Sequence, residues 1–214
     1  MHKRGLVLTI IGLVVLACGV ACTDSTGGIA TPGATVSETD PPTDPPTDEP
    51  SSGSPEPTVE IPARPQELSL DGVKPCSLFA QPQLKQLKDQ FKFDEPPEAD
   101  NSGGTYNAPM CSIAQSAEPF NSVDVLLVTT EGIEPWLTGK RNVDAWLVSV
   151  GGFPAVDYKL AGTEDEECVT SVGVADGQQL MVDLQALQET DYHQLCQITE
   201  KAAAMALQTL QSLK

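Results

Sequence analysis

The N-terminal 22 residues constrain this chain more than any other stretch, because they have the pattern of an export signal and not of a folded domain. A basic cluster at residues 2–4 precedes an apolar run over residues 6–17, and cysteines follow at positions 18 and 22. This order is typical of a signal peptide. A membrane-spanning helix needs about 20 apolar residues, so the run is too short to span. We predict a signal peptide over residues 1–21.

A cysteine that follows alanine at the end of such a run resembles the lipobox of bacterial lipoproteins, where the cysteine is acylated and begins the mature chain. Two cysteines qualify. Cys18 has an apolar residue three places before it, whereas Cys22 has Gly19 at that place. Processing at Cys22 leaves an even set of four cysteines, whereas processing at Cys18 leaves Cys22 as an odd thiol. We favour Cys22 as the lipid attachment site and keep Cys18 as the alternative.

This anchor predicts where the protein works. Its partner is the membrane, reached through the N-terminal lipid, and its location is the outer face of the cytoplasmic membrane in the cell envelope. A secreted protein without lipid is the other interpretation. The net charge of −18 disfavours nucleic acid as a partner, because phosphate binding requires lysine and arginine.

Residues 22–65 are predicted to be a disordered linker. The stretch is rich in Pro, Thr, Ser, Asp and Glu and has almost no large apolar side chains, so it lacks the surface that drives folding. Proline pairs within residues 40–48 favour an extended polyproline conformation. We interpret the linker as a spacer between the membrane and the folded domain.

Residues 66–214 are predicted to fold as one globular α+β domain. A helix begins near Pro82 and buries Leu84, Leu87 and Phe91, and a long helix follows Asp191, its expected N-cap. Residues 93–109 and 131–142 are expected to be loops. The predicted strands cover residues 110–115, 123–128, 143–150, 156–160, 168–174 and 180–184. The fold class is an antiparallel β-sheet packed on one face by an N-terminal and a long C-terminal helix, with two disulfides, preceded by the disordered linker.

The four cysteines left after processing at Cys22 allow three pairings. We favour Cys76 with Cys111 and Cys168 with Cys196, because each bridge then joins a helical region to a strand. Metal binding is the competing role. No C-x-x-C pair occurs, and His193 is the only histidine of the mature chain, so we expect no metal site.

Several motifs follow one another along the chain: Pro75-Cys76-Ser77-Leu78, Cys111, Gly151–Val156, Cys168-Val169, Val172–Val174, Asp176-Gly177-Gln178, and Cys196 in an Ala-rich last helix. In this order they resemble actinobacterial lipoproteins of the domain-of-unknown-function family numbered 3558, over about residues 70–213. Ser112-Ile113-Ala114 depart from the aromatic that the family usually has there. The resemblance implies a PsbP/Mog1-type α/β/α sandwich with a helix on each side of the sheet, and it implies no activity, catalytic residue or cofactor.

No catalytic set emerges. His193 is a candidate general base but has no nucleophile motif, so we predict an exposed residue at the helix start. Glu164–Glu167 lack the spacing of a calcium loop and are predicted to be a solvated turn. We expect Trp146, in a strand, to be in the core. Trp136, in a loop, is expected in the core with a ligand groove as the alternative.

The sequence therefore favours a non-enzymatic binding module of the cell envelope. It does not identify the partner, for which an envelope protein and a small apolar ligand are the candidates. The alternative is a carrier or sensor of a small apolar ligand, held between the sheet and the C-terminal helix. No cofactor is expected for either function.

Overall fold

The computed structural model describes residues 57–103, 106–162, 166–188 and 190–213, which all belong to one compact unit. The predicted signal peptide, the lipidation candidates Cys18 and Cys22, and most of the predicted linker lie outside the described residues. So do Glu164 and Asp165 of the acidic turn. No helix within the described ranges is both long enough and apolar enough to cross a membrane.

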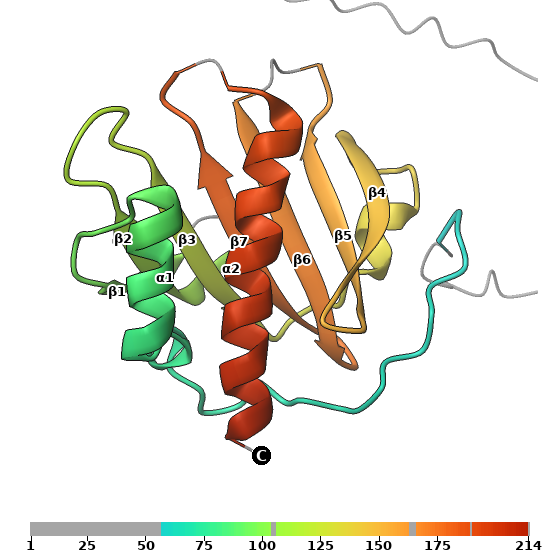
Figure 1. Ribbon diagram of the computed structural model, residues 1–214. Coiled ribbons are helices and arrows are strands. Elements are labelled where there is room, and N and C mark those ends of the chain that lie inside the picture. The colour runs from blue at the N-terminus through green and yellow to red at the C-terminus, as the bar shows by residue number, and fades with distance from the viewer. Residues whose placement is uncertain (1–56, 104–105, 163–165, 189, 214) are drawn as a thin grey trace, which may run out of the picture. The chain divides into compact units, whose positions relative to one another are not determined.

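A seven-stranded antiparallel sheet forms the centre of this unit, in the order β1-β2-β3-β7-β6-β5-β4. The chain builds one edge first, crosses to the opposite edge at β4, and returns so that β7 pairs with β3 in the middle (Figure 1). Tight turns join the later strands, with Gly151, Gly152 and Gly177 at positive φ. The strands are β1 Glu98–Gly103, β2 Ala108–Ala114, β3 Ser122–Val128, β4 Val143–Val150, β5 Phe153–Leu160, β6 Glu167–Ala175 and β7 Gln178–Gln185.

Two α-helices, α1 (Gln81–Phe91) and α2 (Tyr192–Ser212), lie on the same face of this sheet (Figure 1). Asp191 caps α2, because its carboxylate accepts a hydrogen bond from the backbone N–H of Gln194. Small buried residues such as Ala202 and Ala206 bring α2 close to β6 and β7. The predicted fold class, with both helices on one face, is confirmed.

Both disulfides connect the helical layer to the sheet. Cys76 in the short 3₁₀ helix η1 (Pro75–Leu78) pairs with Cys111 in β2, and Cys168 in β6 pairs with Cys196 in α2. This is the pairing that the sequence favours. The bridges close separations of 35 and 28 residues, and loops of that length stabilise a fold by about 4 kcal/mol each in the chain-entropy model.

The opposite face of the sheet carries no α-helix among the described residues, in contrast to the α/β/α sandwich that the resemblance implies. The segment between β3 and β4 covers it instead, through the 3₁₀ helix η3 (Glu134–Leu137). Residues 57–65, which the sequence places in the linker, also pack here. The backbone N–H of Thr58 donates to the carbonyl of Leu137, and Ile61 packs on the same apolar cluster. The folded part therefore extends beyond residue 66 toward the N-terminus.

The prediction of a continuous loop over residues 93–109 is wrong, because β1 lies inside it and pairs with β2. Most of its residues are polar, and residues 98–102 are exposed, since an edge strand buries little of its surface. Such a strand lacks the apolar alternation that identifies a strand in a sequence. The breakers Pro96, Pro97 and Gly103 fit at the ends of an edge strand.

Candidate functional site

An open cleft of about 820 Å³ lies between the β4–β5 edge of the sheet and the N-terminal half of α2. It exists because α2 packs mainly on β6 and β7, so the corner formed by β4 and β5 is left beside the helix (Figure 1). Side chains from three elements line the cleft: Asp144, Trp146 and Val148 from β4, Asp157 and Lys159 from β5, and Asp191, Tyr192, His193, Cys196, Gln197 and Glu200 from the start of α2.

Aromatic rings form one wall of this cleft. Trp146 is 48% exposed, and its ring centroid lies 5.5 Å from that of Tyr192 at an interplanar angle of 51°. The ammonium of Lys159 lies over the Tyr192 ring, 4.9 Å from its centroid. A large exposed indole beside charged groups is typical of a ligand-binding surface.

A pair of carboxyl groups lies beside this wall. Asp157 is directly opposite Trp146 in the β4–β5 pairing and is only 5% exposed. The pKa of Asp157 is raised to about 7, mainly by burial. The hydrogen bond from Thr170 lowers this pKa, and the hydrogen bond and negative charge of Glu200 raise it. Asp157 therefore retains a proton near neutral pH, and beside Glu200 it can accept a cation or donate a hydrogen bond.

Hydrogen bonds through threonines of β6 and α2 hold the Asp157 side chain in place. Thr170 Oγ1 donates to Asp157 Oδ1 at 2.7 Å, and it lies 2.7 Å from Thr199 Oγ1. Thr199 Oγ1 is in turn 3.7 Å from the sulfur of Cys168. A potential ligand atom of Asp157 comes within 4.8 Å of those of Cys168 and Cys196. Both sulfurs are bonded to each other, so this group is a structural support and not a thiolate metal site.

The structure reverses the predicted roles of the two tryptophans. The expectation that Trp146 lies in the core is wrong, because β4 is an edge strand and α2 does not cover its outer corner. Trp136 is 7% exposed and belongs to the apolar cluster on the other face. Its expected place in the core is therefore confirmed.

The other candidate residues have simpler outcomes. His193 is exposed at the start of α2, as predicted, and it lines the cleft beside Tyr192. Of the acidic turn, Glu166 is exposed and Glu167 begins β6. Asp157 and Glu200 were missed by the sequence analysis. The signal was available for Asp157, since it is a charged residue between the apolar Val156 and the aromatic Tyr158 of β5.

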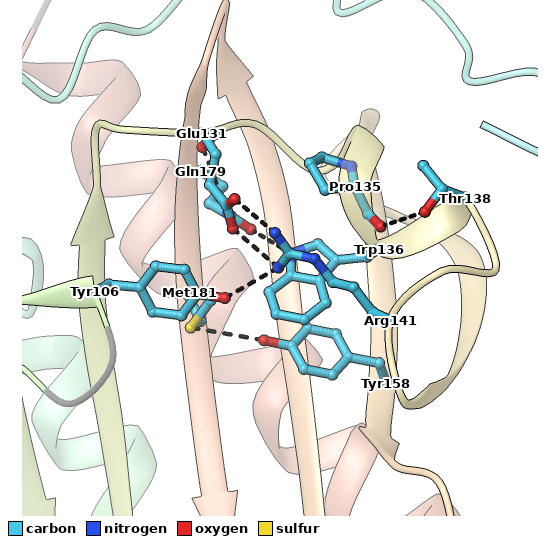
Figure 2. Close-up of polar contacts among 9 residues, drawn as sticks. All are labelled: Tyr106, Glu131, Pro135, Trp136, Thr138, Arg141, Tyr158, Gln179 and Met181. Atoms are coloured by element: carbon cyan, nitrogen blue, oxygen red, sulfur yellow. Dashed lines mark hydrogen bonds and ion pairs between the residues drawn. The ribbon is translucent and has the colours of Figure 1, made fainter. Parts of the chain in front are cut away.

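A second cluster of polar and aromatic side chains lies on the opposite face of the sheet (Figure 2). The guanidinium of Arg141 lies 4.0 Å from the Trp136 ring centroid and donates to both carboxylate oxygens of Glu131 and to the hydroxyl of Tyr106. Trp136 stacks on Tyr158 with centroids 4.0 Å apart and donates to Gln179 Oε1. The polar atoms of this cluster are hydrogen-bonded to one another, so we assign the cluster a structural role. It covers this face of the sheet, where no α-helix packs among the described residues.

Two further carboxyls meet on this same face. Asp124 of β3 and Asp183 of β7 are directly opposite in the strand pairing. Burial raises the pKa of Asp183 to about 7, with contributions from the charges of Glu167 and Asp124. Burial also raises the pKa of Asp124. These carboxyls border no cleft identified among the described residues, so their effect is on stability.

Comparison with known proteins gives a family and no function. A family model described as "Protein of unknown function (DUF3558)" matches residues 13–209. No curated protein and no solved structure matches the chain significantly.

Proposed function

This chain belongs to the DUF3558 family, and we propose that it is a lipid-anchored, non-catalytic binding module of the actinobacterial cell envelope, with the cleft beside α2 as its ligand site. The N-terminal signal pattern and the resemblance to actinobacterial lipoproteins support the location. Two disulfides support an oxidising compartment. The cleft supports the binding role.

The pairing of cysteines supports Cys22 as the anchor. Both disulfides together use all four cysteines that follow Cys22. Cleavage before Cys22 therefore leaves no unpaired thiol, whereas cleavage before Cys18 leaves two cysteines near the N-terminus, one acylated and one free.

We expect the protein from membranes of its own host to have the intact mass of a diacylated chain that starts at Cys22. Reduction should add about four hydrogens, because two disulfides open. Cys22→Ala should move the protein from the membrane to the soluble fraction, whereas Cys18→Ala should leave it attached. Retention of the Cys22→Ala protein, with loss of attachment in Cys18→Ala, would instead assign the anchor to Cys18.

One observation supports the binding role most strongly: an indole that is 48% exposed lies directly opposite a carboxyl that is 5% exposed, in a cleft of about 820 Å³. Burial of a carboxyl costs stability even where hydrogen bonds offset part of that cost, so a buried carboxyl beside a cleft is a candidate functional group. The cleft lies between the sheet and the C-terminal helix, where the sequence analysis places a small apolar ligand. Its charged lining favours a polar ligand instead.

The lining also supports binding over covalent catalysis. It contains no serine, and its cysteine is held in a disulfide. Acid–base catalysis by Asp157 and Glu200 is the competing function that the geometry allows. Hydrolytic turnover that disappears in Glu200→Gln would contradict the non-catalytic proposal.

A thermal-shift panel of polar small molecules tests the ligand site in the full-length chain. We expect at least one class, among neutral sugars, amines and carboxylates, to raise the melting temperature, because a ligand that binds only the folded state stabilises it. The rise should disappear in Trp146→Ala. Phe120→Ala is the matched control, since Phe120 is 54% exposed between β2 and β3 and does not line the cleft. A panel without any shift, or with equal shifts in Trp146→Ala, would contradict the proposal.

A further inference from the structure

We infer that the cleft binds a small organic cation, with its ammonium or guanidinium group held over the Trp146 ring and paired with the carboxylate of Glu200. This inference depends on the proposed function and names the class of its ligand. Three observations support it: the acidic side chains that line the cleft, the exposed indole of Trp146, and the contact of Arg141 with Trp136 and Glu131 on the other face of the sheet.

Negative charge dominates the lining. Asp144, Asp157, Asp191 and Glu200 contribute four carboxyl groups, against one ammonium from Lys159. Three other acidic side chains line the cleft besides Asp157. A cation entering the cleft gains from these charges, because their field is weakly screened between the walls of a cleft. An anion is repelled by the same groups.

The other face of the sheet contains a filled version of the same recognition pattern (Figure 2). There, the guanidinium of Arg141 lies over Trp136 and forms a two-point contact with Glu131, at 3.1 Å and 2.7 Å. Both cation–π attraction and a charged hydrogen bond hold this group. The cleft offers the same components from other residues: the indole of Trp146, the ring of Tyr192 and the carboxyl of Glu200.

The indole of Trp146 is the part of this pattern that the chain leaves unfilled. The basic side chains that lie over aromatic rings in the described part are Arg141 on Trp136, Lys159 on Tyr192 and Lys201 on Phe91. Lys159 thus demonstrates that a cation is accommodated on the cleft wall. Tryptophan is the best aromatic partner for a cation, so an external cation has a better place on Trp146 than on any other exposed ring of the cleft.

Binding of a cation should also release a proton. A positive charge near Asp157 favours its ionised form and lowers its pKa, which is about 7 without a ligand. Affinity is therefore expected to rise between pH 6 and pH 8. The titratable and charged groups that line the cleft around Asp157 are Asp144 from β4, Lys159 from β5, and Asp191, His193 and Glu200 from the start of α2.

A matched pair of probes tests the inference. Butylguanidinium and butylurea have nearly the same shape, and only the first is charged. We expect butylguanidinium to shift the indole N–H resonance of Trp146 in the full-length chain in a saturable way, and butylurea to bind at least about fivefold more weakly. Chitotriose is titrated beside them, because exposed tryptophan and carboxyl groups also suit neutral sugars.

Three variants locate the binding. Trp146→Ala and Glu200→Gln should each weaken butylguanidinium binding about fivefold, as judged by calorimetry. Glu98→Gln is the control. It removes the same charge from an exposed position in β1, at the opposite edge of the sheet, and should leave the affinity unchanged.

The outcomes separate the two proposals. Equal binding of butylurea, or an equal loss in Glu98→Gln, would overturn the cation inference. Selective binding of chitotriose that depends on Trp146 would also overturn it, while the cleft would remain a ligand site. Failure of all three probes, with a blank thermal-shift panel, would remove both the inference and the proposed function.

Discussion

Replacing Trp136 with alanine is expected to lower the free energy of unfolding by about 4 kcal/mol. Three contacts disappear together. The ring stacks on Tyr158 at 4.0 Å, supports the guanidinium of Arg141 at 4.0 Å, and donates through Nε1 to Gln179 Oε1 at 3.0 Å. Gln179 is fully buried, so its carbonyl oxygen loses a partner that water cannot easily replace.

Urea denaturation measures this loss, with two matched variants beside it. Trp136→Phe keeps an aromatic ring and should cost about 2 kcal/mol, because it removes the N–H donor and part of the stacked surface. Trp146→Ala should cost less than about 1 kcal/mol, since its ring is 48% exposed. Similar losses for Trp136→Ala and Trp146→Ala would contradict the structural role of the cluster on the second face.

The two tryptophans also illustrate the limits of the sequence. Strand periodicity places Trp146 correctly in β4, but it does not reveal which corner of the sheet the last helix leaves uncovered. One local signal pointed the right way. Asp144 lies two residues earlier and therefore on the same face of the strand, and a charged neighbour on that face indicates contact with solvent. Trp136 gave no such signal, because the 3₁₀ helix that contains it has only four residues and is too short to show a hydrophobic periodicity.

Most of the architecture was predictable because its signals are local. The Asp191 cap, the Asp176-Gly177 turn and the apolar runs of β3 and β6 depend on short stretches of chain. The position of β7 between β3 and β6 depends on long-range pairing, which no short pattern encodes. The cleft combines β4, β5 and α2 across this pairing, so its acid pair could not be assembled from the sequence.

Stability is expected to fall by about 2 kcal/mol between pH 5 and pH 8, because two buried carboxyls must lose their protons in that interval. The ordinary pKa of each is 3.8, and in the folded protein it is about 7 for both Asp157 and Asp183. The folded state therefore holds more protons than the unfolded chain between these values. The stabilisation is complete below about pH 3.8 and is lost as the pH rises through about 7.

Two asparagine variants test this assignment, since asparagine has the shape of a protonated aspartic acid and does not ionise. Asp157→Asn and Asp183→Asn should each reduce the pH dependence, and each should be more stable than the parent at pH 8 by about 1–2 kcal/mol. Urea midpoints at pH 5 and pH 8 measure the effect. A pKa raised from 3.8 to about 7 corresponds to a full effect of about 4 kcal/mol. We expect a smaller gain, because the cleft around Asp157 is open to water and Asp183 is itself partly exposed.

The control for this pair is Glu98→Gln, which removes one charge from a chain with a net charge of −18. If the loss of stability at high pH came from general repulsion, all three variants would improve the protein equally at pH 8. If the loss comes from burial of the two aspartates, only the two asparagine variants will be more stable than the parent at pH 8. The two aspartates also differ from each other, because Asp157 lines the cleft of the proposed ligand cation and Asp183 does not. Butylguanidinium should therefore stabilise the parent more strongly at pH 8 than at pH 5, should do the same for Asp183→Asn, and should lose this pH dependence in Asp157→Asn.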